Sequence, residues 1–100
     1  MTADIQTLTK EKIKLDEPGL YDVIFLNDNI TTQEFVVRVL KQIFSKTQEQ
    51  AESIMKKIHN DGQGIVGSYV HEVAEQKGIE VTLAARNEGY PLEVRIEEDK

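Results

Sequence analysis

The fold is decided by the run Tyr21-Asp22-Val23-Ile24-Phe25-Leu26 and by the polar stretch Asn27-Asp28-Asn29 that follows it. Val, Ile, Phe and Tyr favour a strand, whereas Asn and Asp favour the turn that ends it. Directly after this turn, Thr31 and Glu34 have the spacing of a helix-capping box. The sequence therefore predicts a strand over 21–26 that leads through a polar turn into a helix.

The same kinds of signal continue along the chain. Apolar residues at three- and four-residue spacing predict two helices, the second of which starts with a capping box at Thr47 and Gln50 and ends at Asp61-Gly62. A strand over 64–70, a helix over 71–87 and an alternating strand over 92–96 follow. The inner face of the third helix is predicted to carry Val73, Ala74, Val81, Ala84 and Ala85.

This order, β-α-α-β-α-β, predicts an α+β fold in two layers, with a three-stranded antiparallel sheet covered by three helices. The chain has 100 residues, the size of one small domain. The pair Pro18-Gly19 marks a boundary in the chain. We expect residues 1–18 to form a flexible N-terminal extension and residues 19–100 to form the domain.

Composition excludes several classes of function. Eighteen acidic residues against twelve basic ones give a formal charge of −6, which argues against a nucleic-acid partner. The chain has no cysteine, and the segment His71-Glu72-Val73-Ala74-Glu75 lacks the second histidine of a zincin helix. No serine lies in a Gly-x-Ser-x-Gly motif. We therefore expect no enzymatic activity, no metal and no cofactor.

The expected location follows from the same composition. Charged residues interrupt the apolar positions of the first fifteen residues, so no secretory signal is expected. No stretch approaches the ~18–20 apolar residues that cross a bilayer. We expect a cytoplasmic, monomeric protein without a membrane partner.

Two features can have a function in ligand binding as well as a structural role. The run Leu26–Thr31 gathers side-chain oxygens that can accept hydrogen bonds from a cation, although a turn and a helix cap explain much of it. His59 shares a helical face with Met55 and Ile58, where a packed boundary residue is the more common role. From these residues alone, both the structural and the functional interpretation stay open.

Taken together, the ordered segments resemble the Clp protease adaptor family ClpS. The resemblance covers about residues 20–96 without a gap, and its specificity lies in the ordered set of segments: Tyr21 to Asp28, Thr31-x-x-Glu34-Phe35-Val36, Val39-Leu40, Ala51-x-x-Ile54-Met55-x-x-Ile58-His59, Gly62-x-Gly64-Ile65-x-Gly67, Glu72-Val73-Ala74-Glu75-x-Lys77 and Ala85-Arg86-x-Glu88-x-x-Pro91-Leu92.

The resemblance implies an adaptor that binds N-degrons, proteins whose first residue is Leu, Phe, Tyr or Trp, and delivers them to the ClpA unfoldase of the ClpAP protease. It assigns the substrate's α-amine to Asn27, Asn29 and His59. The implied side-chain pocket consists of Asp28, Thr31, Gln33, Val36, Met55, Ile58 and Leu92. Glu72 and Lys77 match the face that docks on the unfoldase N-terminal domain, and residues 1–18 match the extension that the unfoldase engages.

The chain departs from the family pattern at two of these positions. Asn29 stands where the family usually has an aspartate, so a negative charge is missing from the amine site or its work shifts to Asp28. Gln33 stands where the family often has a methionine that crowds the pocket entrance and disfavours β-branched first residues. An altered ranking of first residues is the hypothesis that follows.

Elementary chemistry is consistent with the implied amine site. An α-ammonium group carries three donors and a positive charge, and amide oxygens and a neutral imidazole offer acceptors without a competing cation. Two alternatives remain. One is a structural protein–protein module like the C-terminal domain of a ribosomal stalk protein. The other is a regulator that docks on the unfoldase through Glu72 and Lys77 without recognising N-terminal residues.

Overall fold

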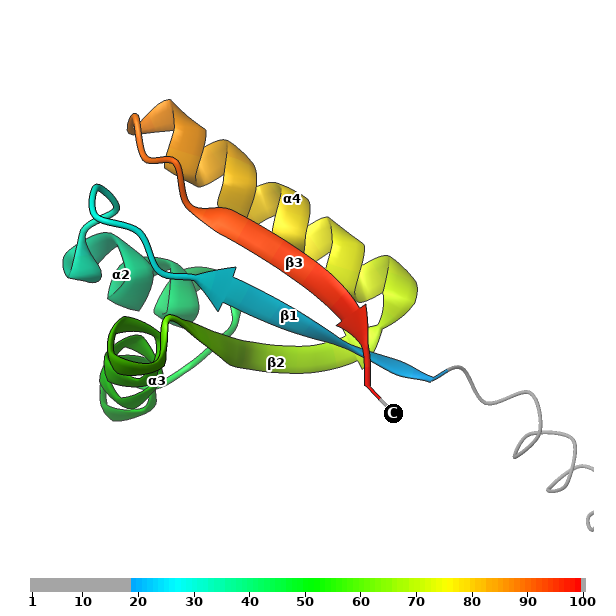
Figure 1. Ribbon diagram of the computed structural model, residues 1–100. Helices are drawn as coiled ribbons and strands as arrows, with labels where there is room; N and C mark the ends of the chain where they lie inside the picture. Colours follow the sequence, from blue (N-terminus) through cyan, green and yellow to red (C-terminus); the bar gives the residue numbers. More distant parts are fainter. Residues whose placement is uncertain (1–18, 100) are drawn as a thin grey trace, which may run out of the picture.

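The structure is a computed structural model that describes residues 19–99, and it confirms the predicted order of elements. Figure 1 shows the elements, which are β1 (Leu20–Leu26), α2 (Gln33–Ile43), α3 (Gln48–Asp61), β2 (Gln63–Val70), α4 (His71–Asn87) and β3 (Glu93–Glu98). The predicted extension, residues 1–18, lies outside the described residues.

The three strands form one antiparallel sheet in the order β2-β1-β3, so β1 is the central strand. Leu26, the last residue of β1, pairs with Gln63 on one side and with Glu93 on the other. On the β2 side the register shifts between Val23 and Ile24. The turn that follows Leu26 therefore emerges beside the junction between α3 and β2.

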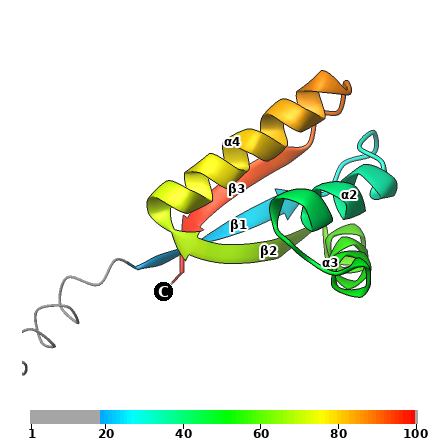
Figure 2. The same cartoon turned by 180° about the vertical axis from the view of Figure 1, so that it is seen from behind.

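The helices cover the sheet as the predicted two-layer α+β fold requires. Seen from behind, α2 and α4 lie on the same side of the sheet (Figure 2), and α3 packs against α2 and β2. The core between these layers contains Val23 and Phe25 of β1 and the apolar face of α2, Phe35, Val36, Val39 and Leu40. Phe25 meets Phe44 edge to face, with ring centroids 5.7 Å apart.

Small residues bring α4 close to the sheet. Its buried positions are Ala74, Gly78, Val81 and Ala85. At Gly78 a Cβ would lie 3.3 Å from Cδ1 of Ile96, which is closer than ordinary packing, so a larger residue there would require the Ile96 side chain to shift. The prediction that Val73 belongs to the inner face is wrong, because the buried stripe follows Ala74 and Gly78 and leaves Val73 37% exposed.

The helix ends show one wrong prediction and one confirmed one. α2 starts one residue later than the Thr31 box implies: Thr32 is its N-cap and accepts a hydrogen bond from the Phe35 backbone N–H at 3.1 Å. The Thr47–Gln50 capping box of α3 is confirmed, with both reciprocal bonds present. Gly62 ends α3 in the left-handed conformation, with φ 87°.

Two kinds of feature are absent from residues 19–99. None of the helices in that range is long and apolar enough to cross a membrane. The same range holds no cluster of three or more His, Asp or Glu side chains suited to a metal ion.

Candidate functional site

A backbone hydrogen bond places the turn after β1 next to the end of α3. The Asn27 N–H donates to the carbonyl of Gly62 at 2.9 Å. Gly62 follows directly on the last turn of α3, which carries His59. Two segments more than thirty residues apart in the sequence are thereby held side by side.

Asp28 organises the turn itself. Its Oδ1 accepts hydrogen bonds from the backbone N–H groups of Ile30 and Thr31 at 2.8 and 2.6 Å, and its Oδ2 accepts one from the Thr31 hydroxyl at 2.7 Å. Partial burial alone would raise the pKa of Asp28, but these bonds and the positive charge of Arg86 outweigh it and hold that pKa below its usual value. Because the Thr31 hydroxyl donates to Asp28, Thr32 caps α2 instead.

We expect Asp28→Ala to lower the free energy of unfolding by about 1–2 kcal/mol at pH 7, because three donors lose a charged acceptor at a partly exposed site. A depressed pKa stabilises the fold fully above the unfolded value of ~3.9, and that contribution disappears as pH falls through the folded value. The difference in unfolding free energy between Asp28→Ala and the parent protein, measured by urea unfolding, should therefore be smaller at pH 3 than at pH 7.

Asp28→Asn is the matched control, because it keeps an acceptor oxygen but removes the charge. We expect it to cost less than Asp28→Ala. A loss that is the same at both pH values would contradict the charge-based explanation.

The predicted α-amine residues converge on one open hollow of about 530 Å3. Its lining includes Asn27, Asn29 and His59, and with them Asp28, Thr31 and Gln33 from the predicted side-chain pocket. The hydrogen bonds within the turn run among Asp28, Ile30 and Thr31, and none of them involves the side chain of Asn27, Asn29 or His59. Six of the ten residues assigned by resemblance to substrate binding thus surround a single space.

The lining of this hollow suits a positively charged ligand. It includes the carboxylates of Asp28 and Glu34 and no lysine or arginine. Amide and imidazole side chains supply further acceptors at Asn27, Asn29 and His59, all of which are exposed. Chemically, the hollow can accept several hydrogen bonds from one small cationic group.

The remaining pocket residues have a different environment. Val36, Ile58 and Leu92 are only 7, 3 and 1% exposed and belong to the hydrophobic core. Met55 is half-buried against that core and lines a second depression, between α2 and α3. The role of these four residues in a side-chain pocket stays a prediction.

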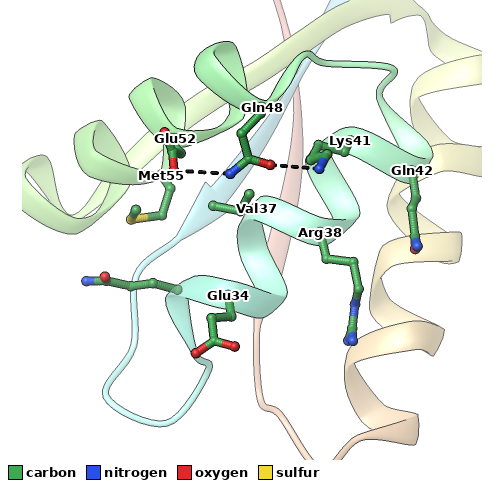
Figure 3. Close-up of a pocket in the computed structure, with 9 residues that line it drawn as sticks. Glu34, Val37, Arg38, Lys41, Gln42, Gln48, Glu52 and Met55 are labelled. Carbon is green, nitrogen blue, oxygen red and sulfur yellow. Dashed lines mark hydrogen bonds between the residues drawn. The ribbon is translucent and has the colours of Figure 1, made fainter.

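The depression between α2 and α3 is a groove of about 390 Å3 that the sequence analysis did not identify. Figure 3 shows Val37 and Met55 facing each other across it, with a chain of hydrogen bonds from Lys41 Nζ to Gln48 (2.7 Å) and from Gln48 to Glu52 (3.1 Å). Gln33 and Glu34 line both this groove and the hollow. The groove that Met55 lines therefore adjoins the hollow at Gln33. Polar residues spaced along both helices were the available signal, and they look like an ordinary solvated face.

The two predicted docking residues differ in their surroundings. Glu72 is exposed in the first turn of α4. The Lys77 ammonium donates to the Ile43 carbonyl at 2.8 Å and lies over the rings of Phe44 and Tyr69, 5.6 and 5.2 Å from their centroids. Lys77 therefore joins α4 to the end of α2, and its docking role stays a prediction.

Comparisons with known proteins agree with one another. A family model described as ATP-dependent Clp protease adaptor protein ClpS matches residues 16–95. A Deinococcus radiodurans protein described as ATP-dependent Clp protease adapter protein ClpS is 44% identical over 95 residues, which cover 95% of this chain and 84% of the relative. A Treponema denticola protein with the same description is 48% identical over 84 residues, 84% of this chain and 83% of that one.

A solved structure supports the same relationship. Agrobacterium tumefaciens ClpS2 bound to L-phenylalaninamide matches with a TM-score of 0.80 and 34% sequence identity. The match covers 83% of this chain and 100% of that one, and it confirms the α+β topology predicted from the sequence.

Proposed function

Because the chain belongs to the ClpS family, the adaptors of the ATP-dependent Clp protease, we propose that it binds N-degron substrates by their free α-amine and a bulky hydrophobic first residue, Leu, Phe, Tyr or Trp. As an adaptor of this family it is not a catalytic enzyme. Delivery of the bound substrate to a ClpA-type unfoldase is part of the proposal.

The observation that carries the proposal is the hollow formed by Asn27, Asn29 and His59. A substrate ammonium placed there meets acceptors on several sides and no opposing lysine or arginine. Charge-assisted hydrogen bonds of this kind contribute ~1.5–3 kcal/mol each. Asn29 leaves the site less negative than an aspartate would, but Glu34 lines the same hollow and supplies a carboxylate whose oxygens are not used by the turn.

The side chain of the first residue needs an apolar environment nearby. Met55 is half-buried and lines the α2–α3 groove, which shares Gln33 and Glu34 with the hollow, and the family pattern assigns the core residues Val36, Ile58 and Leu92 to the walls of the pocket. The A. tumefaciens relative was solved with L-phenylalaninamide, which combines a bulky apolar side chain with a free α-amine. That ligand supports the same combination here.

We assign the docking of the unfoldase N-terminal domain to the start of α4, where Glu72 is exposed. Since the ammonium of Lys77 already bonds to Ile43, its share in docking rests on the parts of its side chain that stay accessible. The monomeric state and the cytoplasmic location belong to the proposal as well.

The proposal is tested by a titration with two fluorescent peptides of identical composition. One begins Leu-Ala and the other Ala-Leu, so that only the position of the leucine differs. We expect a micromolar dissociation constant for the first peptide and at least about tenfold weaker binding of the second, because burial of one leucine side chain contributes ~1.5–3 kcal/mol. Equal affinities would favour the protein–protein module or the regulator without N-terminal recognition.

Gln33→Met is expected to change the ranking of first residues. Gln33 borders both the hollow and Met55, and methionine there would crowd the pocket entrance and exclude β-branched side chains. The ratio of affinities for Leu-first and Ile-first peptides should rise by about fivefold, which corresponds to ~1 kcal/mol. Gln42→Met is the matched control, because Gln42 lies on the same helix and lines only the α2–α3 groove. Identical rankings in all three proteins would discard the hypothesis.

A further inference from the structure

An apolar groove of about 320 Å3 lies between α4 and β3, and it shares no lining residue with the hollow. It is lined by Gly78, Ile79, Thr82 and Leu83 of α4 and by Val94 and Ile96 of β3. Ile79 and Leu83 are 60 and 66% exposed although both are large and apolar. Contiguous apolar surface next to an edge strand is a feature of binding sites.

The chain outside the described residues begins at the end of β3, one of the two elements that form this groove. Tyr21 pairs with Glu98, and the Asp99 N–H donates to the Leu20 carbonyl at 2.9 Å, so the start of β1 lies at the end of β3 (Figure 1). Ile96, which lines the groove, is only two residues before Glu98. A link over residues 16–19 spans up to ~14 Å when extended, enough to bring residue 15 to Ile96.

The sequence just before that link matches the groove in spacing. It reads Lys10-Glu11-Lys12-Ile13-Lys14-Leu15, in which lysine and apolar residues alternate over 12–15. In an extended segment Ile13 and Leu15 lie on one side, ~7 Å apart. Ile79 and Leu83 are one helical turn apart, ~6 Å. The spacing of Ile13 and Leu15 thus matches the spacing of Ile79 and Leu83.

The charges are complementary as well. Residues 71–99 contain eight acidic side chains and three basic ones. Two of the basic ones are engaged with backbone carbonyls: Lys77 with Ile43, and Arg86 with Tyr90 and Leu92. The third, Arg95, pairs with Glu93. Glu75 lines the groove, and Glu98 lies on the same face of β3 as Ile96, whereas the sequence over 10–14 carries three lysines within five residues.

We propose that residues 10–15 of this chain dock in the α4–β3 groove, with Ile13 and Leu15 on Ile79 and Leu83. The groove is then an intramolecular binding site that holds the N-terminal segment against the domain. The contact is separate from N-degron binding, because the groove and the hollow share no lining residue. Any partner that engages the segment has to displace it from the groove first.

The absence of native cysteine permits a direct test in the full chain. Thr9→Cys carries a single nitroxide label, and 1H–15N NMR spectra report which amides it broadens. We expect strong broadening at Ile79, Leu83 and Ile96 and little at Lys56 on α3. Little broadening at the groove would overturn the proposal.

Four further samples define the contact. Replacing both Ile13 and Leu15 by aspartate should remove the broadening at the groove, as should Leu83→Lys, which alters a largely exposed side chain. Thr2→Asp with Thr7→Asp, the matched control, should leave it. In a mixture of labelled chain without 15N and unlabelled 15N chain, the groove amides should stay sharp. Broadening in that mixture, or broadening that survives the aspartates, would overturn docking within one chain.

Discussion

A peptide that begins with leucine is expected to lose at least about a hundredfold of its affinity when its α-amine is acetylated, because two lost charge-assisted bonds correspond to ~3 kcal/mol or more. Acetylation removes the positive charge and leaves a single N–H donor where the ammonium had three. Asn27, Asn29 and His59 present acceptors in the hollow, and two carboxylates line it. The measurement is a fluorescence titration of the peptide and its acetylated twin, labelled at the C-terminus.

Site variants show whether this loss arises in the hollow. Asn27→Ala keeps the backbone bond to Gly62, so it removes the side-chain acceptor without releasing the turn. We expect Asn27→Ala and His59→Ala each to weaken binding of the free peptide about tenfold, the loss of one charge-assisted bond. Neither should change the weak binding of the acetylated peptide. Asn60→Ala, next to His59 but outside the hollow, is the control and should bind like the parent. An acetylated peptide that binds as well as the free one would exclude the amine site.

Phe25→Ala is expected to lower the free energy of unfolding by about 3–5 kcal/mol. Phe25 lies on the central strand, has 0% exposure and packs edge to face on Phe44. Small domains have only ~5–15 kcal/mol of stability, so this single change removes a large part of it. Urea unfolding monitored by circular dichroism measures the loss.

The contrast with an exposed position makes that test specific. Ile65→Ala also shortens a large apolar side chain, but Ile65 is 53% exposed, so we expect a change within about 1 kcal/mol. Phe25→Leu should fall between the two. A loss below about 1 kcal/mol for Phe25→Ala would mean that the sheet and α2 do not share the core described above.

The order of elements was predictable because each one has a strong local signal. The β-branched run of β1, the Thr47–Gln50 box and the glycine after α3 act over a few residues, so sequence alone locates them. The wrong predictions concern positions where a competing or long-range contact determines which residue caps a helix or which residues are buried. Thr31 and Thr32 are equally good caps by sequence, and the capture of Thr31 by Asp28 selects Thr32. The stripe of α4 is set by Gly78 against Ile96, a contact between two elements.

The candidate site was predictable in part for the same reason. Family resemblance assigned Asn27 and His59 to one function, but their proximity depends on the Asn27–Gly62 hydrogen bond, which follows from the register of β1 and β2. The internal contacts of Lys77 with Ile43, Phe44 and Tyr69 join three elements and have no local signature. The α2–α3 groove was missed because its lining residues have the composition of a solvated surface.

The Asn27–Gly62 bond holds the turn and the end of α3 at a set distance, whereas the side chains that line the hollow determine its chemistry. Both partners are main-chain atoms, so every substitution at position 27 except proline, which has no N–H, preserves the spacing between the turn and the end of α3. Exchanges at Asn29 and Gln33 likewise leave this bond untouched, so a designed library at these two positions can alter ligand preference on an unchanged frame.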